Sequence, residues 1–142
     1  MKAVPEWEVL DAGQDKIKEL CDMYPEKIGH IDPAKIGVTV ITNKDRGEGQ
    51  DWDAKIIGIT APASLFSSKT YIIYMNKNTW DTYAPAQRSA MIMFNLLKVP
   101  DPMDGSLLKE DLKDQKCMVK AWGVDYMDNP NLPDISATKQ VF

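Results

Sequence analysis

The chain has 142 residues, of which 44% are hydrophobic and 27% are charged, and its formal net charge is −4. This balance predicts one globular domain, residues 1–142, with a core of normal size. Acidic and lysine residues are interleaved without a basic patch, which argues against direct nucleic-acid binding.

Two further features concern location and chemistry. No apolar run approaches the ~20 residues of a membrane span, and the N-terminus lacks the apolar stretch of a signal peptide. We therefore expect a cytoplasmic protein that does not enter a membrane. His30 is the single histidine, and Cys21 and Cys117 are the two cysteines. These residues cannot build a His-rich zinc site, so we interpret His30 as a loop residue and the cysteines as reduced thiols.

The first half of the chain predicts one helix and three strands. Residues 13–24 place Ile17, Leu20, Cys21 and Tyr24 on one helical face. Strands are expected at 36–43, 54–60 and 69–76, because these segments are rich in β-branched or aromatic residues and are separated by turn residues. They predict a small three-stranded sheet, mixed or antiparallel.

The second half predicts two long helices and a tail. A helix over 85–98 begins with Pro85, a residue suited to the first helical position, and is apolar around enough of its surface to be buried. A second helix is expected over 107–122, and an extended tail over about 124–142. A helix, three strands, two helices and a tail make an α+β fold.

One stretch carries a more specific pattern. In YIIYMNKNTWDTYAPAQRSAMIMFNLLKV (71–99), a strand is followed by a Trp, a Gln-Arg pair and a helix. This order resembles the zincin-like metallopeptidase family of phages and prophages, whose helix carries a His-Glu-x-x-His motif. The resemblance covers roughly residues 7–134 and continues in KEDLKDQKCMVKAWGVDYMDNPNLPD, where the family has a His-Asp pair opening a helix. It implies a small zincin-like domain.

The residues at the family's catalytic positions do not fit its chemistry. Phe94 stands at the first zinc-ligand position, Asn95 at the general base and Lys98 at the second ligand, while Glu110 takes the place of the downstream His. A ring offers no lone pair, an amide does not take up a proton near neutral pH, and an ammonium repels a dication. We therefore expect a pseudo-metallopeptidase with no metal, no cofactor and no catalytic activity.

The exchanged residues suggest a structural replacement for the metal. Lys98 and Glu110 carry opposite charges at two positions that would face one ion. We hypothesise that they form a salt bridge between the two helices, worth about 0–1 kcal/mol if partly exposed. The alternative is that the two charges are solvated independently.

Several residues are candidates for contacts with a partner. The polar segment 43–53 misses the order of an EF-hand and is interpreted as a surface loop, in which Trp52 could anchor a partner. Trp80 and Tyr83 are further candidates, although packing residues are the alternative for both. Acidic candidates in the loop are Asp45, Glu48 and Asp51.

The resemblance implies a phage protein in the cytoplasm of a bacterial host that binds another host or phage protein. An inhibitor of a host defence system, such as a CRISPR effector, is the function it favours (an anti-CRISPR role). Two alternatives stay open. One is a metal-dependent hydrolase whose Glu110, Asp111 and loop acids hold Mg²⁺ or Mn²⁺. The other is an acidic mimic of nucleic acid.

Overall fold

The computed structural model describes residues 6–42, 54–108, 116–122, 126–128 and 130–142. Within these ranges the chain is a mixture of helices and strands, so the predicted α+β class is confirmed. No helix in them has the length and apolarity needed to cross a membrane. The elements in chain order are β1 (Glu6–Val9), α1 (Asp11–Met23), α2 (Pro25–Ile28), η1 (Pro33–Lys35), β2 (Ile36–Thr42), β3 (Lys55–Gly58), η3 (Ala63–Phe66), β4 (Tyr71–Asn76), α3 (Lys77–Thr82), α4 (Pro85–Leu96), α5 (Lys116–Trp122) and η4 (Tyr126–Asp128).

The sheet is mixed and, in the described part of the chain, has four strands in the order β1-β2-β4-β3. β2 and β4 are parallel neighbours, while β1 and β3 run antiparallel to them at the two edges. The prediction of three strands was wrong because it missed β1. That strand is short, and all its residues are exposed, so its extended state depends on pairing with β2.

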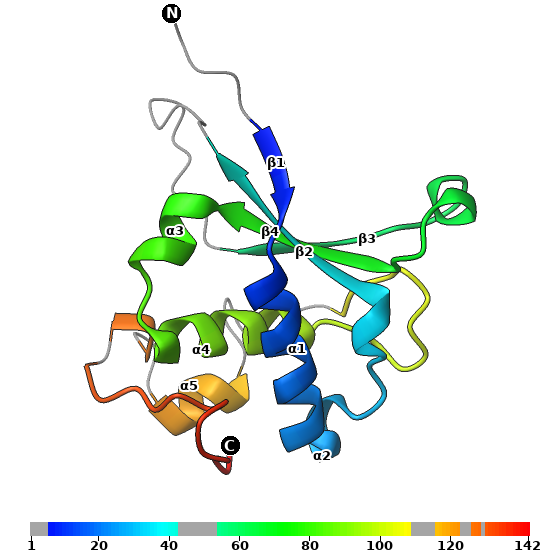
Figure 1. Ribbon diagram of the computed structural model, residues 1–142. Helices are drawn as coiled ribbons and strands as arrows, with labels where there is room; N and C mark the ends of the chain where they lie inside the picture. The colour runs from blue at the N-terminus through cyan, green and yellow to red at the C-terminus, as the bar shows by residue number, and fades with distance from the viewer. Residues whose placement is uncertain (1–5, 43–53, 109–115, 123–125, 129) are drawn as a thin grey trace, which may run out of the picture.

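The helices lie on one face of the sheet, which gives the molecule two layers (Figure 1). Alternate residues of the central strands point into this interface, because successive side chains of a strand face opposite sides. Val38 and Val40 of β2 and Ile73 and Met75 of β4 are fully buried there. The helices contribute the rest of the core, including Ile17, Leu20, Ile92, Met93 and Leu96.

Two helix predictions need correction. Leu107 and Leu108 are exposed and not helical, so the second long helix does not begin at 107; α5 is described from Lys116, and 109–115 lie outside the described residues. α3 was missed because Asn, Thr and Asp are weak helix formers. Its helical state accompanies burial of Trp80.

The C-terminal segment 130–142 contains turns and packs on the helical layer, whereas an extended tail was expected. Ile135 is fully buried in the core, and its carbonyl oxygen accepts a hydrogen bond from the Tyr24 hydroxyl at 2.8 Å. Phe142 lies against the rings of Tyr24 and Trp122. These contacts join the C-terminal segment to the end of α1 and to α5.

Gly58, the last residue of β3, lies against the backbone of Gly105 and has no room for a side chain. A Cβ placed on Gly58 would overlap the carbonyl oxygen of Gly105, which itself has a φ of +88°. The Tyr71 hydroxyl fixes this loop, because it accepts from the Gly105 N–H at 3.0 Å and donates to the Ser106 carbonyl at 2.7 Å. The backbone at Gly105 is therefore held in place and cannot easily move away from a Cβ on Gly58.

Gly58→Ala is expected to lower the free energy of unfolding by about 1–3 kcal/mol, because it overpacks backbone against backbone. Gly37→Ala is the control, since a Cβ there meets only side-chain atoms, at 3.7 Å or more. Urea denaturation of both variants checks this expectation. An equal loss in the two variants would show that the loss of glycine itself, and not the Gly105 contact, is responsible.

Candidate functional site

Phe94 and Asn95, which the resemblance aligns with catalytic positions, lie on α4, and Lys98 lies just after it. Asn95 is fully buried, and its Nδ2 donates to the carbonyl oxygens of Met91 at 3.0 Å and Ala54 at 3.4 Å. Its Oδ1 is buried and has no hydrogen-bond donor among the described residues. The Lys98 ammonium lies 4.4 Å from the centroid of the Phe94 ring.

This arrangement joins Phe94 to Lys98 by a cation–π contact, while Asn95 bridges α4 to the residue before β3. A cation held over an aromatic face is attracted to the ring by about 0.5–1 kcal/mol at an exposed site. Neither the Phe94 ring nor the Lys98 ammonium presents a lone pair to a metal. Glu110 lies outside the described residues, so the proposed salt bridge with Lys98 stays a prediction. The same holds for a carboxylate site built on Glu110 and Asp111.

The Gln-Arg pair at the start of α4 has structural contacts. Gln87 Oε1 accepts from the Ala84 N–H at 2.8 Å and its Nε2 donates to the Met127 carbonyl at 2.8 Å. Arg88 Nε donates to the Trp80 carbonyl at 2.9 Å, and its guanidinium lies 4.7 Å from the Trp80 ring centroid. These contacts tie the start of α4 to α3 and to η4.

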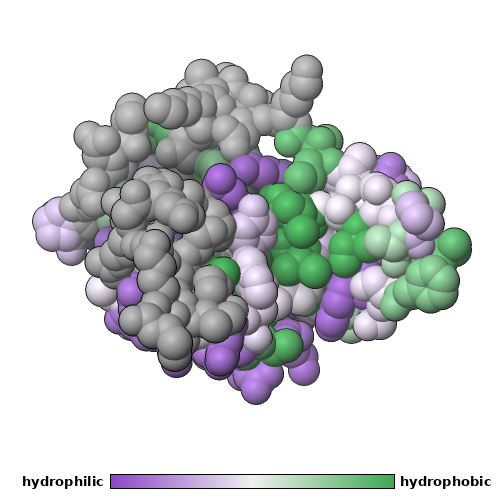
Figure 2. Space-filling model, turned by 90° about the horizontal axis from the view of Figure 1, so that it is seen from above, coloured by the Kyte–Doolittle hydropathy of each residue, from purple (hydrophilic) through white to green (hydrophobic). Residues whose placement is uncertain are grey.

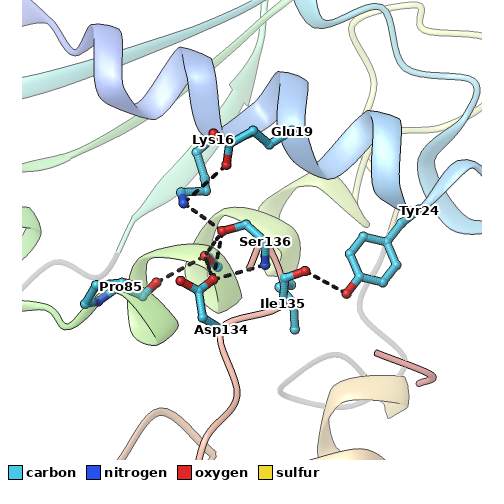
Figure 3. Close-up of polar contacts among 8 residues, drawn as sticks. Lys16, Glu19, Tyr24, Pro85, Asp134, Ile135 and Ser136 are labelled. Atoms are coloured by element: carbon cyan, nitrogen blue, oxygen red, sulfur yellow. Dashed lines mark hydrogen bonds and ion pairs between the residues drawn. The ribbon is translucent and has the colours of Figure 1, made fainter. Parts of the chain in front are cut away.

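A polar cluster lies between α1, α4 and the C-terminal segment (Figure 3). The Ser89 hydroxyl is 2.6 Å from Asp134 Oδ1 and 3.1 Å from Ser136 Oγ. Ser136 Oγ lies 2.8 Å from the same carboxylate oxygen and accepts from Lys16 Nζ at 2.7 Å. Lys16 is also paired with Glu19 at 3.5 Å.

A lysine beside a serine suggests nucleophilic catalysis, but the cluster does not support it. Lys16 contacts Ser136 and is also ion-paired with Glu19, so its side-chain nitrogen is engaged by a carboxylate as well as by the serine. Ser89 is fully buried. The cluster therefore fastens the C-terminal segment to two helices.

The Asp134 carboxylate gives this fastening a pH dependence. Partial burial raises its pKa, but hydrogen bonds from Ser89 and Ser136 and the charge of Lys16 outweigh burial and hold the pKa below the usual value. An acid with a lowered pKa in the folded state stabilises the fold above its unfolded pKa, and this stabilisation is lost as pH falls through the lowered value.

Asp134→Ala is expected to lower the free energy of unfolding by about 1–2 kcal/mol near neutral pH, because two serine hydroxyls lose their acceptor. The difference in the free energy of unfolding between variant and wild type should stay constant down to about pH 4, where an ordinary Asp carboxyl titrates. Below that pH the difference should shrink. Urea denaturation at several pH values measures this. A difference that does not change with pH would contradict the assigned role of the charge.

Part of the opposite face of the sheet is uncovered by the described residues, and this part is called the open face. Trp7, Thr39, Ile57, Ile72 and Tyr74 line a groove of about 480 Å³ on it. Trp7 is 55% and Ile57 46% exposed, and the rings of Trp7 and Tyr74 meet edge to face at 5.9 Å between centroids. Figure 2 shows a band of hydrophobic surface on the side of the molecule that is seen from above.

A second exposed apolar feature adjoins the sheet. The connection between β3 and β4 projects from the body of the molecule and contains η3 (Figure 1). Leu65 and Phe66 in it are 76% and 91% exposed. Contiguous apolar surface on a folded protein commonly marks an interaction site.

Trp80 and Tyr83, two of the partner contacts predicted from the sequence, do not line this groove. Trp80 is only 6% exposed, so the expectation that it offers surface to a partner is corrected: its ring packs in the core and under Arg88. Tyr83 is partly buried against the core. Trp52 and the loop acids lie outside the described residues; these acids are Asp45, Glu48 and Asp51.

The sequence contains a signal for the open face that the strand prediction did not use. From Tyr71 to Met75 the residues on both faces of β4 are apolar or aromatic, and a strand of this kind is expected to be covered on both sides. Ile72 and Tyr74 belong to the uncovered side. Together with Ile57 of β3, they indicate a second apolar face.

Comparisons with known proteins give no assignment. No protein-family model matches the chain, and neither a curated protein nor a solved structure matches it significantly. The resemblance to phage metallopeptidases, the phage origin and the cytoplasmic location therefore stay predictions.

Proposed function

We propose that this protein acts by binding another protein through its open sheet face, on a zincin-like scaffold that does not catalyse peptide hydrolysis. The observation that carries the proposal is the apolar groove lined by Trp7, Thr39, Ile57, Ile72 and Tyr74. Exposed aromatic and aliphatic side chains in a concave patch are typical of binding anchors. No described element covers them.

The chemistry at α4 supports the non-catalytic part of the proposal. Phe94 and Lys98 are in contact with each other, and Asn95 is buried with its amide hydrogens on two carbonyls. None of the three can take the role of a zinc ligand or a general base. The positions that would carry peptidase chemistry instead hold packing and hydrogen-bonding groups.

The resemblance to phage proteins supplies the class of partner. We place the partner among bacterial defence proteins, with a CRISPR effector as the first candidate, and the protein as its inhibitor. A protein with exposed binding anchors and no catalytic groups inhibits by occupying a surface of its target, in a fixed ratio to it.

The test is affinity capture from a bacterium that carries such a defence system, followed by mass spectrometry. Wild-type protein is compared with Ile57→Asp, which places a charge in the groove, and with Leu107→Asp, which changes an exposed leucine outside it. A partner held by the wild type and Leu107→Asp, and lost with Ile57→Asp, is expected. Metal-dependent peptide cleavage by the purified protein, with no such partner, would refute the proposal.

A further inference from the structure

The outer side of the edge strand β1 carries backbone groups that form no hydrogen bond with any described residue. In an antiparallel pair, alternate residues bond to the neighbouring strand, and the residues between them direct their N–H and C=O groups away from it. The Leu10 N–H donates to the Val38 carbonyl of β2 at 2.9 Å, which fixes this alternation along β1. Trp7 and Val9 therefore direct their N–H and C=O groups away from β2.

The other edge of the sheet differs, because described residues already lie against β3. By the same alternation the Ala54 carbonyl lies on the outer side of this strand, where it accepts a hydrogen bond from Asn95 Nδ2 at 3.4 Å. At the other end of β3, the Gly105 backbone lies against Gly58. Of the two edges, β1 is therefore the one that the described chain leaves more accessible.

The side chains of the same two β1 residues belong to the open face. Trp7 is 55% and Val9 is 63% exposed. Trp7 lines the apolar groove, and Val9 is paired in register with Thr39, which lines it as well. The accessible backbone edge is thus continuous with the border of the groove.

We propose that the partner adds an extended segment to β1 as a new edge strand, bonded to the backbone groups of Trp7 and Val9. This inference rests on the proposed function and names how the partner is held. A strand ~4.8 Å from β1 places alternate side chains beside Trp7 and Val9, with ~4.5–5.5 Å between Cβ atoms. Apolar residues at these alternate positions cover both side chains, while the main chain supplies the hydrogen bonds.

A second copy of this chain is disfavoured as the source of the added strand. The antiparallel register that bonds all the outward groups of both copies sets Glu8 directly opposite Glu8 of the second copy. The two Cα atoms would lie ~4.5 Å apart, and like charges in this position are destabilising. The ion pair of Glu8 with Lys77, at 3.5 Å, is half exposed and offsets little of this repulsion. The segment therefore comes from a different protein.

The first test removes one outward donor and leaves the bonds between β1 and β2 in place. Val9→Pro deletes an N–H that points away from β2, and proline is accepted on edge strands in this orientation. Val9→Thr is the matched control, since threonine keeps the N–H and the branched shape. Calorimetric titration of the partner that the wild type captures should show at least about a tenfold loss of affinity with Val9→Pro and less than about a threefold loss with Val9→Thr.

Hydrogen exchange of the wild-type protein, followed by NMR, is a second test that needs no variant. The amide hydrogens of Trp7 and Val9 have no acceptor among the described residues and should exchange quickly in the free protein. In the complex they donate to the added strand, so their exchange should slow by at least about tenfold.

Equal affinity of Val9→Pro and Val9→Thr, unchanged exchange of the two amides, or wild-type dimerisation that Val9→Pro abolishes would each overturn the inference. If the partner is lost with Ile57→Asp but kept with Val9→Pro, the proposed function stands and the strand addition does not. A lysate from which the wild type captures no partner would refute both.

Discussion

Ile57→Asp is expected to weaken binding of the purified partner by at least about a hundredfold, which makes it the largest functional effect of any single change considered. The aspartate would stand in the apolar groove and lose its water shell when the partner binds, which is costly for a charged group. Titration calorimetry of the wild type and the variant against the captured partner measures the loss.

The fold should tolerate this change, because Ile57 is 46% exposed on an edge strand. Leu107→Asp, at a leucine that is 39% exposed, is the matched control and is expected to leave affinity within about threefold of the wild type. If both variants bound as tightly as the wild type, the open face would not be the binding surface. Circular dichroism establishes that both are folded.

Asn95→Asp is expected to destabilise the fold by about 3–5 kcal/mol at neutral pH, because it buries a carboxylate that no described group is placed to neutralise. Burial raises the pKa of such a carboxyl in the folded state. The folded state then holds its proton to higher pH than the unfolded state does, so the loss should diminish as pH falls through the raised pKa. Urea denaturation across pH measures both the size and the sign.

Asn95→Leu separates structure from chemistry at the same position. Leucine has a similar shape and removes the buried Oδ1 that lacks a donor among the described residues, but it also removes the Nδ2 bonds to Met91 and Ala54, so the expected loss of stability is about 1–2 kcal/mol, smaller than for Asn95→Asp. Because no reaction is assigned to Asn95, this variant should also keep full affinity for the partner. A folded Asn95→Leu protein that had lost a measurable hydrolytic activity would contradict the non-catalytic account.

The elements that the sequence predicted well have a strong local pattern. β2 and β4 combine β-branched and aromatic residues with turn residues at their ends, and α1 and α4 have apolar residues at helical spacing. The elements that were missed depend on tertiary contacts. β1 is held by its pairing with β2, and α3 forms where Trp80 enters the core.

The candidate site divides in the same way. The sequence places Phe94, Asn95 and Lys98 together through helical spacing, and the structure brings the ring of Phe94 and the ammonium of Lys98 into contact. The open face could not be assembled from local patterns, because Trp7 and Ile57 come from opposite edges of the sheet. Their proximity depends on strand order, which spacing along the chain does not reveal.

The most direct test of binding by the open face is an amide NMR comparison of the protein free and with its captured partner. The account predicts that the largest shift changes fall on β1, β2, β3 and β4 around Trp7, Thr39, Ile57 and Ile72, together with the Trp7 indole N–H. Changes confined to α4 around Phe94, Asn95 and Lys98, with the strands unaffected, would contradict it.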